Sequence, residues 1–224
     1  MRLHPIAILS FAALPLLLAP ACSAPAGGRD EFTIRAPFDL HSGRPALNED
    51  GTVNVVVEIP AGSCAKWEVG DDGALHWEIR DGKPRVVKYL PYPGNYGMVP
   101  RTLLAEEDGG DGDPLDVLIL GEAVERGAVV PVRVIGVLEL LDGGEQDDKL
   151  LAVVAGSALD VADLAELERR FHGVTSIVET WFANYKGPGV MEAQGLSGAE
   201  RAGEILRTAA RTYEQHHAAG GAGH

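Results

Sequence analysis

AVVPVRVIGVLEL, from Ala128 to Leu140, is a Val-rich stretch that favours extended backbone. Branching at Cβ restricts valine and isoleucine in a helix and suits them to the pleated surface of a sheet. Pro131 and Gly136 interrupt the stretch, and a proline cannot donate to the ladder of a central strand. We therefore predict one long strand that is bent or bulged near these two residues.

Shorter strands are predicted before and after this stretch. They cover Val53–Ile59, the region around Ala74–Arg80 between two Asp-Gly turns, Arg85–Leu90, Asp116–Leu120 and Lys149–Val154. Six or seven short strands at close spacing are typical of a β-barrel or a β-sandwich.

The C-terminal part of the chain changes to helical periodicity. Ser157, Ser176 and Ser197 are each followed three residues later by an acid, which is the pattern of a capping box. Apolar residues recur behind each box at helical spacing. The third stripe consists of Ala202, Leu206, Ala209 and Tyr213. We expect a mainly β protein (α+β) with amphipathic C-terminal helices.

The chain is acidic, with 19 Lys+Arg against 33 Asp+Glu in 224 residues and a net charge of -14. This balance argues against a nucleic-acid-binding protein, because the phosphate backbone attracts clustered Lys and Arg. Two cysteines, Cys22 and Cys64, cannot support a disulfide-rich scaffold. The charge suits a protein that binds cations.

Residues 1–21 have the layout of a secretory signal peptide. Arg2 is followed by an apolar run from Ile6 to Ala19, which is short for a membrane span, and then by small residues. Cys22 comes next, as in the lipobox of bacterial lipoproteins, although Pro20 interrupts that motif. Lipidation of Cys22, simple cleavage nearby and an uncleaved apolar tail are the three alternatives.

The remaining chain divides into three parts. We expect a linker and lead-in over residues 22–50, a single domain over 51–215 and a disordered tail over 216–224. With a signal peptide, the expected location is exported, either periplasmic or anchored to the membrane by lipid. A cytoplasmic location is the alternative.

The segment Glu106–Asp116 carries six acids in eleven residues and no base. A glycine and a proline hold the backbone tightly around Asp111 and Asp113, and Asp116 opens an apolar strand. Carboxylates this close repel one another unless a cation lies between them, and oxygen ligands suit a hard divalent cation. A calcium EF-hand is rejected, because Asp116 occupies the position where that loop needs glycine.

A second acidic cluster, Leu141–Lys149, lies between two predicted strands, where a hairpin turn is the simpler interpretation. Cationic and phenolic residues complete a pattern, and they are Lys66, Arg85, Lys88, Tyr92, Tyr96, Tyr185 and Lys186. Carboxylates for metal, with Lys, Arg and Tyr for anionic oxygens, are what phosphoryl chemistry needs. The sequence has no Walker motif, so a P-loop enzyme is not expected.

From about Val53 to Lys186, the chain resembles a family I soluble inorganic pyrophosphatase. The stretch DGDPLDVL, Asp111–Leu118, reproduces the family's D-G/N-D-P-x-D-V signature. Further motifs match in order, namely Glu58-Ile59-Pro60, Lys66-Trp67-Glu68, Tyr92-Pro93-Gly94-Asn95-Tyr96-Gly97, Asp142 with Asp147 and Lys149, and Tyr185-Lys186. The resemblance implies an OB-like five-stranded β-barrel with flanking helices, here in an exported or lipoprotein-like form.

The resemblance also implies roles for the matching residues. The activating Mg²⁺ ions would be held by Asp111, Asp116 and Asp147. Further Mg²⁺ ions, three or four in all, would be held with help from Asp142 and Glu58. Asp113 would be the general base. Phosphate contacts would come from Lys66, Arg85, Tyr96, Lys149, Tyr185 and Lys186, with support from Glu68 and Tyr92.

The implied reaction is hydrolysis of pyrophosphate to two phosphates by Mg-bound hydroxide attacking in line, without a phosphoenzyme. Relatives assemble as homo-oligomers, which implies the same here. Arg80 is an alternative to Arg85 as the phosphate arginine, and Gly143 stands where relatives often carry Glu. Two weaker alternatives are a phosphate or polyphosphate receptor that has lost catalysis and a calcium-binding structural domain.

Overall fold

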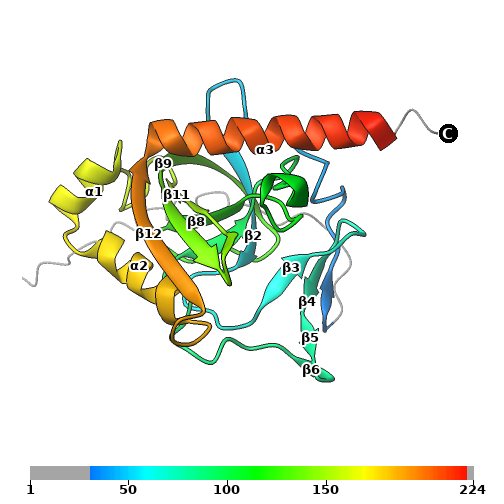
Figure 1. The fold of residues 1–224 in the computed structure, drawn as a ribbon, viewed down its shortest axis with the longest axis horizontal. Coiled ribbons are helices and arrows are strands. Elements are labelled where there is room, and N and C mark those ends of the chain that lie inside the picture. The colour runs from blue at the N-terminus through cyan, green and yellow to red at the C-terminus, as the bar shows by residue number, and fades with distance from the viewer. Residues whose placement is uncertain (1–30, 221–224) are drawn as a thin grey trace, which may run out of the picture.

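A closed five-stranded barrel forms the centre of the computed structural model, which describes residues 31–220 (Figure 1). Its strands are β2 (Val53–Ile59), β7 (Asn95–Met98), β8 (Asp116–Leu120), β11 (Lys149–Val153) and β9 (Val129–Asp142). Pairing runs in that order, and β9 also pairs with β2, which closes the ring. The predicted fold class is confirmed. The predicted signal peptide and Cys22 lie outside the described residues.

The barrel strands are buried on both faces, which explains their continuous apolar runs. On β8, Val117 and Ile119 pack in one core cluster with α3 (Ala199–Gly220), whereas Leu118 and Leu120 pack in another with α2 (Val174–Asn184). Figure 1 shows α3 lying along one side of the barrel, with α1 (Leu164–Arg170) and α2 beside β12 (Met191–Gly198). The helices therefore cover strand faces that cannot meet water.

The long strand β9 has the irregularity that its sequence predicts. Leu151 pairs with Gly136 and Ala152 pairs with Val134, so Ile135 is an extra residue on β9. A bulge of this kind increases the local twist and lets one strand contribute to several neighbours. Indeed β9 pairs with β2, β11, β12 and the short β10 (Glu145–Gln146).

The predicted helices are present, but none begins at its predicted capping box. Asp163 caps α1 by accepting a hydrogen bond from Glu166 N at 2.7 Å, while Ser157 lies in the preceding turn. Ser176 lies inside α2, and Ser197 belongs to β12, which the sequence analysis missed. A serine followed three residues later by an acid is common by chance. This pattern alone therefore misplaces the first residues of the helices.

The predicted strand over Arg85–Leu90 is wrong. Only Val86 pairs there, in an isolated bridge with Ala65, and Leu90 is 67% exposed. The apolar residues of this connecting segment resemble those of a strand. The segment has no neighbouring strand with which it could form a ladder. The preceding residues form a two-stranded ribbon of β5 (Ile79–Arg80) and β6 (Lys83–Pro84).

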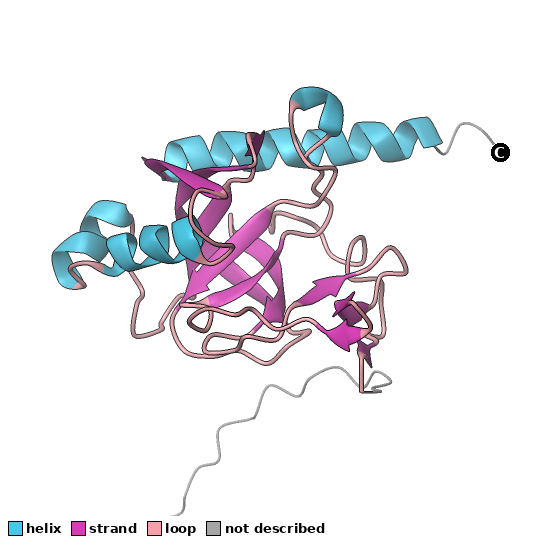
Figure 2. Ribbon diagram, turned by 60° about the horizontal axis from the view of Figure 1, so that its bottom comes forward, coloured by secondary structure: helices cyan, strands magenta, loops and turns pink. Residues whose placement is uncertain are grey.

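Residues 31–50, expected as part of a linker, instead fold onto the domain. The strand β1 (Thr33–Ile34) pairs with β4 (Leu75–Trp77), which pairs with β3 (Trp67–Val69), and this small sheet lies beside the barrel (Figure 2). Leu40 is buried in the core next to this sheet. At the other end, α3 continues to Gly220, so residues 216–220 are helical and not part of a disordered tail. No helix within residues 31–220 is long and apolar enough to cross a membrane.

One glycine is required by a close approach of two barrel strands. Gly97 on β7 pairs with Val57 on β2, and a Cβ at position 97 would lie 1.8 Å from the carbonyl oxygen of Val56. No side chain can occupy that space without separating the strands. The same pairing holds Tyr96 beside Ile59, so the position of this tyrosine depends on it.

We predict that Gly97→Ala lowers the free energy of unfolding by ~3 kcal/mol or more, because the added methyl group collides with backbone. Gly198→Ala is the matched control, since a Cβ there meets nothing within 4 Å. Urea unfolding of both variants measures the difference. Equal stabilities for the two variants would contradict the strand packing described here.

Candidate active site

A polar cleft of 290 Å³ opens between the barrel and the small sheet, and carboxylates, cations and phenols line it. The cleft brings together thirteen of the fourteen predicted site residues, and these are Glu58, Lys66, Glu68, Arg85, Tyr96, Asp111, Asp113, Asp116, Asp142, Asp147, Lys149, Tyr185 and Lys186. They come from sequence positions more than a hundred residues apart, so only the folded chain can assemble them.

The deepest part of the cleft lies where two parallel strands begin. Asp116 is the first residue of β8 and Lys149 the first of β11, and the two residues are paired in register. Lys149 Nζ donates to Asp116 Oδ2 at 2.6 Å and also to Asp147 Oδ1. Burial disfavours the charged form of Lys149, but the two carboxylates outweigh burial and raise its pKa. The lysine is therefore a fixed cation.

Glu58 reaches the cleft from an irregular position on β2. Its neighbours Val57 and Ile59 pair with consecutive residues of β7, which leaves Glu58 as an extra residue. Its Oε1 accepts a hydrogen bond from Val69 N at 2.8 Å. Burial is the main cause that raises the pKa of Glu58 to about 8, against the opposing charge of Lys66. The positive charge near Glu58 is thus too small to offset the effect of burial on its carboxyl group.

Each of the other cations in the cleft has a carboxylate partner. Lys66 Nζ lies 2.5 Å from Glu68 Oε1, and Arg85 Nη1 lies 2.5 Å from Glu78 Oε2. Lys186 pairs with Asp142. Arg80, the alternative phosphate arginine, does not line the cleft. Its side chain is 63% exposed and 3.7 Å from Glu78. The geometry therefore favours Arg85.

The loop with Asp111 and Asp113 is held by its own backbone. Asp113 N donates to Asp111 Oδ1 at 3.0 Å, while Leu104 N donates to Asp113 O at 2.9 Å. Asp113 lies at the solvent-accessible mouth of the cleft. Partial desolvation by the cleft walls, followed by the charges of Asp111 and Asp116, raises the pKa of Asp113 to about 6. A carboxylate with this pKa can accept a proton near neutral pH.

Tyrosines form one wall of the cleft. Tyr96 and Tyr185 line it, and burial raises the pKa of both, so the phenols remain protonated donors. Tyr92 does not line the cleft; its ring lies 5.2 Å from Tyr96 and 4.4 Å from Trp181, centroid to centroid. It supports the tyrosine wall from behind.

His41 also lines the cleft, and the sequence analysis missed it. It lies in the segment that was interpreted as a linker, and no motif surrounds it. Only the packing of residues 31–50 onto the small sheet could have indicated that this histidine approaches the site.

The charge of the cleft fits divalent cations. Seven carboxyl groups face four cationic side chains, which leaves an excess of three negative charges when every acid is ionised. All of the available donors on the acids are oxygens, as Mg²⁺ requires. In the described part of the chain, no three acidic, histidine or cysteine side chains already stand together as a metal site. The ammonium groups of Lys149 and Lys186 contact the carboxylates instead.

The sequence matches the family model described as inorganic pyrophosphatase over residues 55–214. The chain belongs to this family. A soluble inorganic pyrophosphatase of Chlamydomonas reinhardtii is 37% identical over 184 residues, which cover 80% of this chain and 88% of that protein. The inorganic pyrophosphatase of Mus musculus is 34% identical over 163 residues, which cover 64% of this chain and 56% of that protein.

Solved structures of the family share the fold of this chain. The type I enzyme from Toxoplasma gondii has a TM-score of 0.75 at 29% identity, covering 80% of this chain and 89% of that one. The inorganic pyrophosphatase from Neisseria gonorrhoeae has a TM-score of 0.67 at 29% identity, covering 79% and 99%. The chain spans about half the length of several eukaryotic relatives, such as 52% of a chloroplastic pyrophosphatase of Arabidopsis thaliana.

We predict that metal-free protein becomes less stable as pH rises from about 5 to 8. In this range the native state keeps the Glu58 proton, because its folded pKa is about 8, whereas the unfolded state has lost it. The native state then binds more protons, so the free energy of unfolding falls, by up to ~1.4 kcal/mol per pH unit for one group.

Glu58→Gln removes this titration and keeps an acceptor for Val69 N. Its stability should therefore fall less steeply with pH than that of the wild type. Urea unfolding in a chelator at several pH values measures both slopes. Identical slopes would show that Glu58 is not a buried, protonated acid in the metal-free protein.

Proposed function

We propose that this chain hydrolyses inorganic pyrophosphate to two phosphates by direct in-line attack of water on one phosphorus, without a phosphoenzyme. One observation carries the proposal: a single cleft contains both the carboxylates that suit divalent cations and the cations and phenols that suit phosphate oxygens. Membership of the pyrophosphatase family supports the same substrate.

The cationic and phenolic residues of the cleft would bind and orient the substrate. Lys66 and Arg85 reach it from the small-sheet side, and Lys149 and Lys186 from the barrel and the end of α2. Tyr96, Tyr185 and these cations can donate hydrogen bonds to the oxygens of both phosphates. Glu68 and Glu78 hold Lys66 and Arg85 in place before substrate arrives.

The carboxylates proposed to hold Mg²⁺ are Asp111, Asp116, Asp147, Asp142 and Glu58. When bound, Mg²⁺ supplies positive charge to phosphate oxygens and makes water more acidic. Three or four ions would neutralise the cleft once pyrophosphate adds its own negative charge. Lys149 keeps Asp116 and Asp147 close together, so these two ligands are already oriented.

Asp113 is the proposed general base. It lies in the cleft with the metal-binding acids, and its pKa of about 6 suits proton transfer near neutral pH. Its backbone is fixed by Leu104, so the carboxylate can aim at one position.

We also propose that residues 1–21 direct export, with the protein either periplasmic or anchored by a lipid on Cys22, and that the protein assembles as a homo-oligomer. The sequence of the N-terminus supports export, while some relatives are chloroplastic or mitochondrial by name. N-terminal analysis of protein purified from whole cells tests export. A chain that begins at a lipidated Cys22, or at an unmodified residue near it, is expected, and a chain that begins at Met1 would contradict export.

We predict rapid phosphate release from pyrophosphate with Mg²⁺ and negligible release from ATP, because the cleft of 290 Å³ is small and most of its lining side chains are charged groups that suit phosphates. Phosphate release is measured with each substrate, with and without a chelator. A receptor would release none from either, and equal rates with both substrates would contradict the substrate assignment.

Asp113→Asn should lower kcat by about a hundredfold or more, which is the usual contribution of a general base. Glu106→Gln is the matched control, because Glu106 belongs to the same acidic segment but does not line the cleft. Steady-state kinetics and urea unfolding are measured for both variants. Near-normal turnover of folded Asp113→Asn would remove Asp113 from its proposed role.

A further inference from the structure

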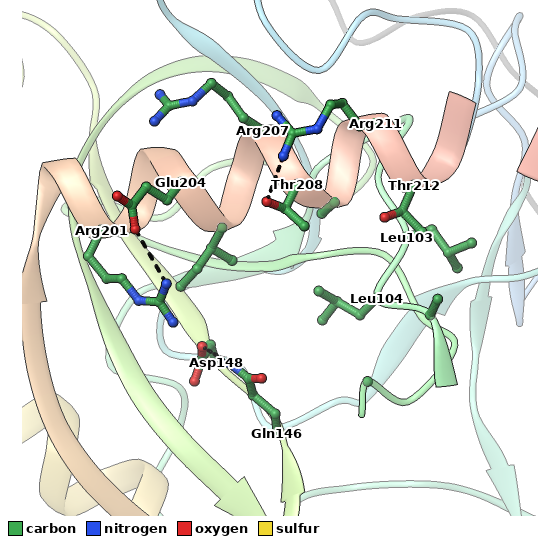
Figure 3. A pocket seen from close by; sticks show the side chains of 14 residues that line it. Leu103, Leu104, Gln146, Asp148, Arg201, Glu204, Arg207, Thr208, Arg211 and Thr212 are labelled. Atoms are coloured by element: carbon green, nitrogen blue, oxygen red, sulfur yellow. Dashed lines mark hydrogen bonds and ion pairs between the residues drawn. The ribbon is translucent and has the colours of Figure 1, made fainter. Parts of the chain in front are cut away.

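A second cavity, of 460 Å³, lies between α3 and the barrel (Figure 3). It shares no lining residue with that cleft. Its volume is in the range of small-molecule sites. The apolar residues that line it include Leu103, Leu104, Ile205 and Ala209, and arginines of α3 line it as well.

One wall of this cavity is connected by backbone to the proposed general base. Leu103 N donates to Ala209 O of α3 at 3.0 Å. The next residue, Leu104, donates to Asp113 O at 2.9 Å and accepts from Gly112 N at 2.8 Å. A shift of this wall relative to α3 would therefore move the loop that carries Asp113.

The opposite wall is connected to the proposed metal ligands. Asp148 faces the cavity, whereas its neighbours Asp147 and Lys149 face the catalytic cleft. Successive side chains of an extended chain point to opposite sides, so one short segment lines both hollows. Asp148 is fixed by hydrogen bonds from Leu140 N at 3.1 Å and from Gln146 Nε2 at 2.7 Å.

The cavity offers positive charge without a carboxylate partner. Arg207 and Arg211 are one helical turn apart on α3 and line the same cavity. Arg211 donates to Thr208 at 3.1 Å, and within residues 31–220 neither arginine has an ion pair. Arg201, by contrast, lies 3.4 Å from Glu204 and 3.8 Å from Glu139.

An occupant must match all three features of the cavity. Guanidinium groups bind phosphate in a fork and stack on flat rings. The leucine and isoleucine side chains that line the cavity need an apolar surface on the ligand. The Asp148 carboxylate can accept hydrogen bonds from N–H groups of the ligand, and the Gln146 side-chain amide can donate to its acceptors.

We propose that this cavity is an effector site for a small phosphate ester with a flat, partly apolar ring, such as a nucleoside monophosphate. Binding would tighten α3 against both walls and so change the positions of Asp113 and Asp147. The effect on turnover rests on the proposed function, whereas binding itself does not. This is a binding site beyond the catalytic cleft, with its own ligand class.

The test uses AMP with the full, Mg²⁺-loaded protein, because AMP has no phosphoanhydride bond to cleave. Calorimetric titration measures binding to the wild type, Arg207→Gln, Arg211→Gln and Arg169→Gln. Arg169 is the matched control, since it is an exposed arginine on α1, outside the cavity. We expect each cavity variant to bind AMP about tenfold or more weakly, with basal turnover unchanged and the control unaffected.

Two further measurements complete the test. Amide exchange at Leu104 and Gly112 should slow when AMP binds the wild type, and kcat or KM for pyrophosphate should change.

The proposal is overturned if AMP does not bind, if all variants bind it equally or if AMP only competes with pyrophosphate. A concentration-dependent dimer that is lost in Arg211→Gln would also overturn it, because a second copy would then cover the cavity. If AMP binds as expected but pyrophosphate is not hydrolysed, the proposed function fails and the binding site stands.

Discussion

The ammonium group of Lys149, buried between Asp116 and Asp147, is the interaction on which the site depends. It joins the starts of two parallel strands and fixes two acids that would otherwise repel each other. Removing one partner of such a buried pair typically costs about 3–5 kcal/mol, because a charge is left without compensation. The same contact therefore serves the stability of the barrel and the orientation of the proposed metal ligands.

The remaining charge of the cleft explains how an acidic protein can take an anionic substrate. Four cationic side chains cannot neutralise seven carboxylates. Burial, together with the charges of neighbouring carboxylates, raises the pKa values of Glu58 and Asp113. Divalent cations held by these carboxylates would supply the positive charge that makes the cleft attractive to pyrophosphate. The lysines that hold the acids before metal binds can then donate to phosphate oxygens.

The sequence predicts the barrel well where both faces of a strand are buried. Val53–Ile59 and Asp116–Leu120 match their strands residue for residue, because continuous apolar runs have few other uses. It fails at Arg85–Leu90 and at β12, where pairing depends on neighbours that are distant in sequence. Contiguous motifs likewise indicate the acids of the cleft, whereas His41 and the unpaired arginines of α3 become visible only when distant segments meet.

The most direct test of this account is a crystal structure of the protein with Mn²⁺ in place of Mg²⁺, located by anomalous scattering. The account predicts anomalous peaks in the catalytic cleft, in contact with carboxylates of Asp111, Asp116 and Asp147. Anomalous peaks only at acidic residues outside the cleft would contradict the account. So would a cleft without peaks at saturating Mn²⁺, in which the lysines still contact the carboxylates.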